Sequence, residues 1–161
     1  MTAEVVLERA EIEARIPHRD PFLFVDRAWL GRSDASGADA PAATLTAEWR
    51  VPESADFFRG HYPGNPITPG VILCEHAFQA AAVLLCERGA RFGASGDVPV
   101  LARIEKARFR RMVRPGETLR TAVELVDTVG PASYLAARST VDGAPALEVR
   151  CVLSRAERSE A

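Results

Sequence analysis

Residues 71–88 read VILCEHAFQAAAVLLCER, and this segment decides the fold class. It is apolar on nearly every side of a helix, which is typical of a helix buried in a core rather than one lying on a surface. Gly89 follows at once and is a common helix end. Because three polar side chains interrupt the apolar run, the segment is a poor membrane span. We therefore predict one long central helix at about residues 70–88.

Segments with strand character lie on both sides of this helix. The predicted elements are a short helix at 8–15, strands at 22–30 and 44–51, the central helix, and strands at 99–112, 117–128, 132–141 and 145–154. Residues 31–42 have the composition of a loop, and Asp142-Gly143 predicts a tight hairpin between the last two strands. One buried helix beside a run of hairpin-linked strands predicts an α+β fold with an antiparallel sheet.

Composition limits the class of protein further. The chain has 161 residues, 47% hydrophobic and 26% charged, as expected for one globular domain over residues 1–161. Residues 155–161 are small and charged, and we expect a flexible tail there. The net charge of −2 gives no general attraction to nucleic acid or to a membrane. The amino terminus lacks a signal-peptide pattern, and the three cysteines lack metal-ligand spacing, which favours a reducing, cytoplasmic setting.

Glu75 is the first candidate for chemistry. It lies about one turn into the central helix among apolar neighbours, where an ionised carboxylate is costly, so we expect burial to raise its pKa. A carboxylic acid of this kind can donate a proton near neutral pH. Gln79 is four residues further on and shares the same helix face, so its amide can hold the Glu75 carboxyl, although a polar residue at the rim of the helix fits the pattern nearly as well.

His61 is the second candidate. Residues 57–70 read FFRGHYPGNPITPG, which places one imidazole in a loop stiffened by glycine and proline. A solvated or structural histidine is the simpler alternative, but an imidazole can take up a proton near neutral pH. A base at His61 and an acid at Glu75 suit proton removal and return, and therefore lyase or hydratase chemistry. Spacing leaves open whether the two meet in one subunit or across a dimer.

The start of the central helix is the third candidate site. Gly70 allows close approach to the backbone, and the free N–H groups of a helix start can bind a carbonyl oxygen on which charge builds. Taken alone, Gly70 is better explained as ordinary helix-start punctuation. We assign neither His18 nor His76 to catalysis, since His18 fits a structural hydrogen-bonding role and His76 points about 100° away from Glu75. No pair of histidines has zinc spacing, so we expect no metal.

A basic stripe follows in residues 106–114. Its cations are Lys106, Arg108, Arg110, Arg111 and Arg114. The first three alternate along a predicted strand and would share one face. This face is either simply solvated or a docking surface for an acidic partner. Nucleic acid is not expected, because the domain is net acidic and the stripe offers no aromatic platform.

Taken together, these motifs resemble the (3R)-hydroxyacyl-acyl-carrier-protein dehydratases of type II fatty acid synthesis, the FabZ type. The similarity covers roughly residues 11–154. The matching pieces are Ile16-Pro17-His18-Arg19, Pro21-Phe22-Leu23, Val25-Asp26-Arg27, Phe57-Phe58-Arg59-Gly60-His61, Pro69-Gly70-Val71 with Glu75 and Gln79, Lys106-Ala107-Arg108-Phe109-Arg110-Arg111, and Val113-Arg114-Pro115-Gly116-Glu117. Several linked motifs at matching spacing are more specific than any one of them.

The resemblance implies a hotdog fold, a curved antiparallel sheet wrapped around one long helix. It implies a homodimer, or three such dimers in a hexamer, with His61 of one chain facing Glu75 of the other. His61 would be the base, Glu75 the acid, Gln79 its orienting residue, and the Gly70 N–H the group that holds the thioester carbonyl. The substrate would be a 3-hydroxyacyl chain on the phosphopantetheine of an acyl carrier protein, with no cofactor, and the basic stripe would meet that carrier.

Some positions depart from the family pattern, and they leave alternatives open. His76 and Phe78 replace residues that are normally small beside the expected tunnel, so the acyl group is either a fatty acyl chain or a polyketide or polyene chain. Two other functions remain: a hotdog acyl thioesterase, which would release a free acid, and a non-catalytic subunit that pairs with an active dehydratase. Intact His61 and Glu75 argue against the non-catalytic subunit.

Overall fold

The computed structural model describes residues 5–31, 44–90, 92 and 96–157. Its elements are, in chain order, β1 (Val5–Glu8), α1 (Arg9–Arg15), β2 (Arg27–Gly31), β3 (Thr44–Arg50), the 3-10 helix η1 (Asp56–Arg59), α2 (Gly70–Glu87), β4 (Val98–Phe109), β5 (Thr118–Val129), β6 (Ala132–Val141) and β7 (Ala144–Ala156). The predicted central helix is therefore confirmed to within a residue at each end.

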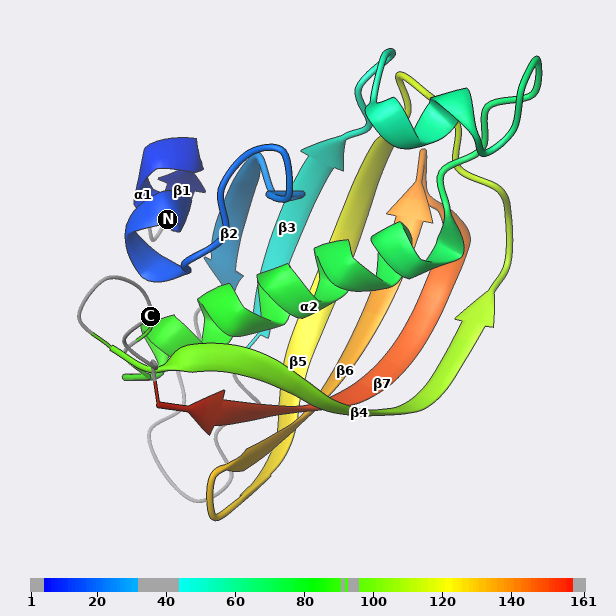
Figure 1. Cartoon of the computed structure of the whole chain (residues 1–161). Helices are drawn as coiled ribbons and strands as arrows, with labels where there is room; N and C mark the ends of the chain where they lie inside the picture. The colour runs from blue at the N-terminus through cyan, green and yellow to red at the C-terminus, as the bar shows by residue number, and fades with distance from the viewer. Residues whose placement is uncertain (1–4, 32–43, 91, 93–95, 158–161) are drawn as a thin grey trace.

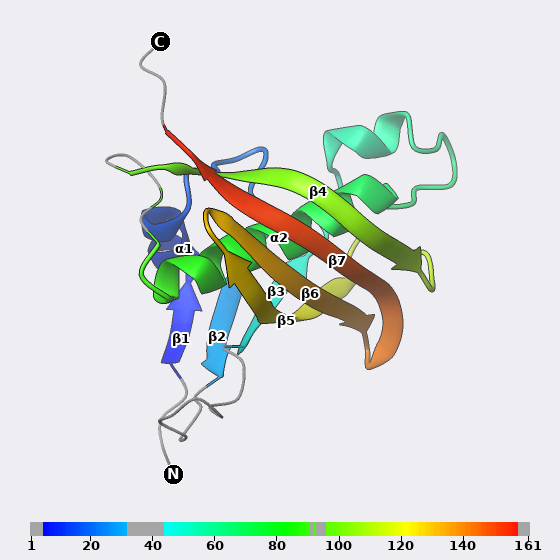
Figure 2. The same ribbon diagram turned by 90° about the horizontal axis from the view of Figure 1, so that it is seen from below.

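The strands form one antiparallel sheet in the order β1-β2-β3-β5-β6-β7-β4. The sheet curves around α2, which lies along its concave face (Figures 1 and 2). The helix has the length and mean hydropathy of a membrane span, 1.4, but 67% of it is buried inside the fold, as expected for a core helix. This arrangement confirms the α+β hotdog fold.

The first predicted strand, residues 22–30, is wrong in its first half. The strand pairing begins at Arg27, preceded by one backbone hydrogen bond from the Asp26 N–H to the Glu48 carbonyl of β3. Upstream, the Phe24 N–H donates to Gln79 and the Phe24 carbonyl contacts His76, so side chains of α2 replace a strand as the hydrogen-bonding partners of this backbone. Periodicity in the sequence cannot reveal such partners.

The carboxyl-terminal elements match the prediction closely. Asp142 and Gly143 have φ of 50° and 78°, the left-handed pair required by a tight hairpin. The predicted flexible tail at residues 155–161 starts too early in the sequence. Arg155 and Ala156 still belong to β7 and pair with β4. Residues 158–161, and residues 32–42 of the expected loop, lie outside the described residues. Among the cysteines, Cys74 and Cys151 are buried and Cys86 is half-buried, and all three are free thiols.

Candidate active site

Glu75 lies in the second turn of α2 and is only partly covered. Its side chain is 22% exposed, and its Oε1 accepts a hydrogen bond of 2.9 Å from Gln79 Nε2. Burial raises the pKa of this carboxyl, and the Gln79 hydrogen bond opposes the rise. The direction agrees with the prediction, and it leaves a carboxylic acid suited to proton donation.

Gln79 belongs to the core rather than to the rim of the helix, since it is only 1% exposed. Its Oε1 accepts the Phe24 N–H at 2.8 Å, and its Nε2 donates to the Phe22 carbonyl at 3.0 Å as well as to Glu75. Because one partner is a donor and the other two are acceptors, the orientation of the amide is fixed. Gln79 therefore holds the acid and the loop before β2 at the same time.

His61 follows η1 in the chain, and the loop between η1 and α2 lies at the end of α2 where the helix begins (Figure 1). Its Nδ1 is 2.8 Å from the Ile67 carbonyl, and its ring stacks on Tyr62 at 4.1 Å between centroids. A carbonyl only accepts, so the ring proton is on Nδ1 and Nε2 carries the free lone pair. The loop is anchored by the Arg114 guanidinium, which donates to the Asn65 Oδ1 at 3.0 Å.

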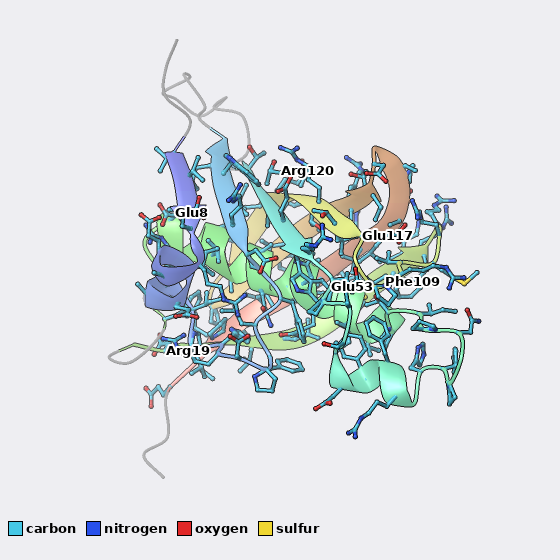
Figure 3. All side chains as sticks on the ribbon, turned by 90° about the horizontal axis from the view of Figure 1, so that it is seen from above. Glu8, Arg19, Glu53, Phe109, Glu117 and Arg120 are labelled. Atoms are coloured by element: carbon cyan, nitrogen blue, oxygen red, sulfur yellow. The ribbon has the colours of Figure 1, made fainter. Side chains whose placement is uncertain are left out.

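Gly70 begins α2, and its N–H has no hydrogen-bond partner among the residues that the structure describes. The N–H groups of Ile72 and Leu73 already donate to the Pro69 carbonyl, and no side chain caps the helix. A Cβ on Gly70 would come within 2.9 Å of the Phe109 ring, so the close approach requires glycine. Figure 3 shows Phe109 at the same end of the molecule as Glu53 and Glu117. An N–H group at a helix start is the kind of donor that an oxyanion site uses.

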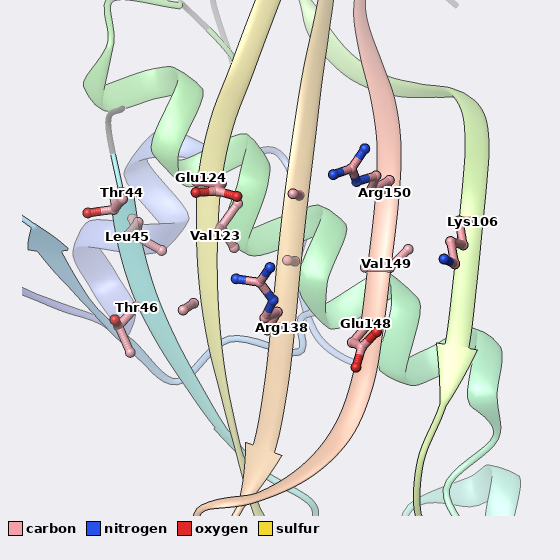
Figure 4. A pocket seen from close by; sticks show the side chains of 13 residues that line it. Thr44, Leu45, Thr46, Lys106, Val123, Glu124, Arg138, Glu148, Val149 and Arg150 are labelled. Carbon is pink, nitrogen blue, oxygen red and sulfur yellow. The ribbon is translucent and has the colours of Figure 1, made fainter. Parts of the chain in front are cut away.

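His61 and Glu75 make no direct polar contact within a single chain. Across the described residues, His61 and Glu75 share neither a hydrogen bond nor an ion pair, and each has partners of its own. A depression of about 360 Å³ does exist, but it lies on the outer face of the sheet, where Lys106, Arg138 and Arg150 line it, and it contains neither residue (Figure 4). The described contacts of one chain therefore do not join the two side chains.

His18 is the residue that sequence reasoning missed. Its Nε2 lies 3.6 Å from Glu75 Oε1, so it belongs to the surroundings of the acid. No sequence signal indicates this contact, because the two residues are far apart along the chain and only the path of the loop after α1 brings them together.

His76 and Phe78 lie in the core of this chain, not on an open surface, with 0% and 6% exposure. The His76 Nδ1 is 2.6 Å from the Phe24 carbonyl, and its ring stacks on Trp49. Complete burial lowers the pKa of His76 to about 4, so the ring is neutral near pH 7. His76 is therefore a structural residue, as its position after Glu75 suggests.

The basic stripe divides into two groups. Lys106 and Arg108 lie on the outer face of β4, exposed and without an ion pair among the described residues, with Lys106 opposite Arg150 (Figure 4). The other three cations are engaged within the chain: Arg110 with Glu148, Arg111 with Glu117, and Arg114 with Asn65. Among the described residues, the first group therefore has no ion pair within the chain, whereas the second group does not stand alone. Within the described ranges, no three His, Cys, Asp or Glu side chains form a metal-ligand group.

Comparisons with known proteins identify the family of the chain. A family model described as a FabA-like domain matches residues 16–150. The 3-hydroxyacyl-[acyl-carrier-protein] dehydratase FabZ of Oenococcus oeni is 41% identical over 83% of this chain and 88% of its own length. The enzyme of the same name from Bacillus pumilus is 34% identical over 92% of this chain and 96% of its own.

Among solved structures, the dehydratase heterocomplex ApeI:P of Xenorhabdus doucetiae superposes with a TM-score of 0.54. The match covers 77% of this chain and 97% of that one at 23% identity, and therefore supports the fold alone. The family model and the two relatives cover most of the sequence, including His61, Gly70, Glu75 and Gln79. The chain thus belongs to the FabA-like family, among the 3-hydroxyacyl-[acyl-carrier-protein] dehydratases of the FabZ type.

Proposed function

We propose that a homodimer of this chain removes water from 3-hydroxyacyl chains carried by an acyl carrier protein, in fatty acid synthesis. The observation that carries this proposal is the Glu75 carboxyl. Burial raises its pKa, Gln79 holds it, and it lies on the helix that begins at Gly70, whose N–H has no partner among the described residues. An acid beside an oxyanion donor is what elimination from a thioester requires.

The dimer is supported by the edge strand β4. Residues 100–109 of β4 are exposed, and the large apolar side chains of Val100, Leu101 and Ile104 are 38–46% exposed. An unpaired edge with apolar side chains is a template for another strand. If a second copy pairs with β4 about a two-fold axis, the same surface of each chain forms the interface. Each of the two resulting sites can then combine His61 of one chain with Glu75 of the other.

The proposed reaction balances with these groups alone. The Gly70 N–H binds the thioester carbonyl oxygen as negative charge builds on it. His61 Nε2 takes the proton from C2, and the electron pair forms the C2–C3 double bond. The C3–O bond breaks as Glu75 gives its proton to the departing hydroxyl, which leaves as water. A trans-2-enoyl thioester remains, and proton exchange with solvent restores both side chains.

The carrier protein is expected to dock at Lys106 and Arg108, since these are the cations of the stripe without an internal partner. Changing either residue to Glu should raise KM for a carrier-bound substrate about threefold to tenfold with little change in kcat, because exposed charges act mainly on encounter. The increase should shrink as salt is added.

Steady-state kinetics at several salt concentrations measure this effect. Arg155→Glu is the matched control, because Arg155 is exposed and lies near the end of α2 away from Gly70. A short pantetheine thioester, which has no carrier surface, should respond to none of the three changes. Equal effects of Arg155→Glu would refute docking at the stripe.

The function is tested by the intact mass of 3-hydroxyacyl carrier protein after incubation with the purified chain. Loss of one water is the expected result. Loss of the whole acyl group would indicate a thioesterase instead. No change with short, long or unsaturated acyl chains, or with polyketide-type chains, would reject the homodimeric dehydratase, and activity that appears only with a second subunit would indicate a partner role.

A further inference from the structure

A third titratable side chain approaches the proposed acid. His18 lies in the loop after α1, and its Nε2 is 3.6 Å from Glu75 Oε1, with both side chains about one-fifth exposed at 21% and 22%. Gln79 Nε2 donates to the same oxygen at 2.9 Å. Two nitrogens therefore face Oε1, whereas Oε2 has no hydrogen-bond partner among the described residues.

The surroundings of His18 decide which of its nitrogens carries the proton. Its Nδ1 is buried and has no hydrogen-bond partner. A buried N–H without an acceptor is rarer and more costly than an unpaired lone pair, so the proton of the neutral ring is on Nε2. Burial and the neighbouring Arg19 guanidinium lower the pKa of His18, which keeps the ring neutral near pH 7. The protonated Nε2 of His18 thus faces Glu75 Oε1 across 3.6 Å, a distance slightly longer than a hydrogen bond.

The two donors also determine where Glu75 keeps its own proton. The orientation of the Gln79 amide is fixed by the Phe24 N–H, so its contact with Oε1 is a donation. Because Oε1 already accepts the Gln79 N–H, a protonated Glu75 places its own O–H more favourably on the other oxygen. The transferable proton is consequently on Oε2, the oxygen without a partner.

We propose that His18 is a positioning residue: together with Gln79 it holds Glu75 Oε1, so that the proton on Oε2 is presented to the substrate hydroxyl. This inference rests on the proposed function of Glu75. A donor to Oε1 also favours the carboxylate that remains after transfer, so His18 adjusts the strength of the acid as well as its direction. The other charged or titratable groups near the pair are Arg19, Cys74 and, in the proposed dimer, His61 of the second copy.

Two variants separate positioning from a purely structural role. His18→Phe keeps a flat ring but removes the donor, whereas His18→Gln can place an amide N–H where Nε2 lies. For His18→Phe we expect kcat to fall about tenfold with KM little changed, and the alkaline limb of the pH–rate profile to move up by about half to one pH unit. The limb moves up because loss of a donor to the carboxylate raises the pKa of Glu75. His18→Gln should restore both values.

A direct titration makes the test independent of folding yield. The carboxyl carbon shift of Glu75, followed by NMR against pH, should report a higher pKa in His18→Phe than in the wild type and in His18→Gln. An unchanged titration and an unchanged alkaline limb in His18→Phe would overturn the inference, as would His18→Gln behaving like His18→Phe. If the wild type removes water while these results fail, only the role of His18 is lost. If the wild type fails to remove water, the proposed function itself is refuted.

Discussion

Glu75→Gln should slow dehydration by a factor on the order of 10² to 10⁴, because the amide cannot give a proton to the leaving hydroxyl. The substitution keeps the shape of the side chain, and the new carbonyl oxygen can still accept from Gln79 Nε2. The fold should therefore survive. The loss should appear in kcat, since the acid acts in the transition state rather than in binding. Conversion of hydroxyacyl carrier protein, followed by mass, measures it.

Glu124→Gln is the matched control for this experiment. It makes the same change of charge, but Glu124 lies on the outer face of the sheet beside Arg138 and away from α2 (Figure 4). Wild-type turnover is expected there. Turnover by Glu75→Gln within tenfold of the wild type would remove Glu75 as the acid, whatever the family resemblance implies.

Mixing two inactive proteins should restore activity. In a site shared by two chains, a dimer of one His61→Ala chain and one Glu75→Gln chain has one doubly damaged site and one intact site. Random reassociation makes about half of the dimers mixed, so about one quarter of wild-type activity should return from near zero. The chains must first be separated by denaturant and refolded together, and the rate is then compared with each variant refolded alone.

The mixing experiment has a different outcome if each site lies within one chain. If both residues served one site within a single chain, every site in the mixture would lack one of them, and activity would stay at the level of the single variants. Since His61 hydrogen-bonds to Ile67 while Glu75 contacts Gln79, with no direct contact between the pair in one chain, we expect recovery.

The parts of the fold that depend on local pattern were predictable. The apolar segment at 71–88 specified a buried helix, and Asp142-Gly143 specified a hairpin because both residues must take positive φ. The same holds within the site. Glu75 and Gln79 are one helical turn apart, so their hydrogen bond follows from helix geometry.

The parts that depend on distant partners were not predictable. The backbone at Phe22–Phe24 has strand-like residues, yet its hydrogen bonds go to the side chains of Gln79 and His76. His18 meets Glu75 only because of the course of one loop. The stripe shows the same limit: its spacing could not distinguish Arg111 and Arg114, which have internal partners, from the two free cations.

The hydrogen bonds of Gln79 indicate which positions around Glu75 tolerate substitution and which do not. The amide recognises the main chain at residues 22 and 24, not the side chains there. Any residue with an ordinary peptide group satisfies those contacts, so Phe22, which is 51% exposed, can be exchanged without disturbing the acid. Position 79 has no such freedom. Replacing Gln79 would leave the Phe24 N–H and the Phe22 carbonyl without their partner, and it would also remove the hydrogen bond to Glu75. Variation among descendants of this chain should therefore accumulate in the loop and be rare at residue 79.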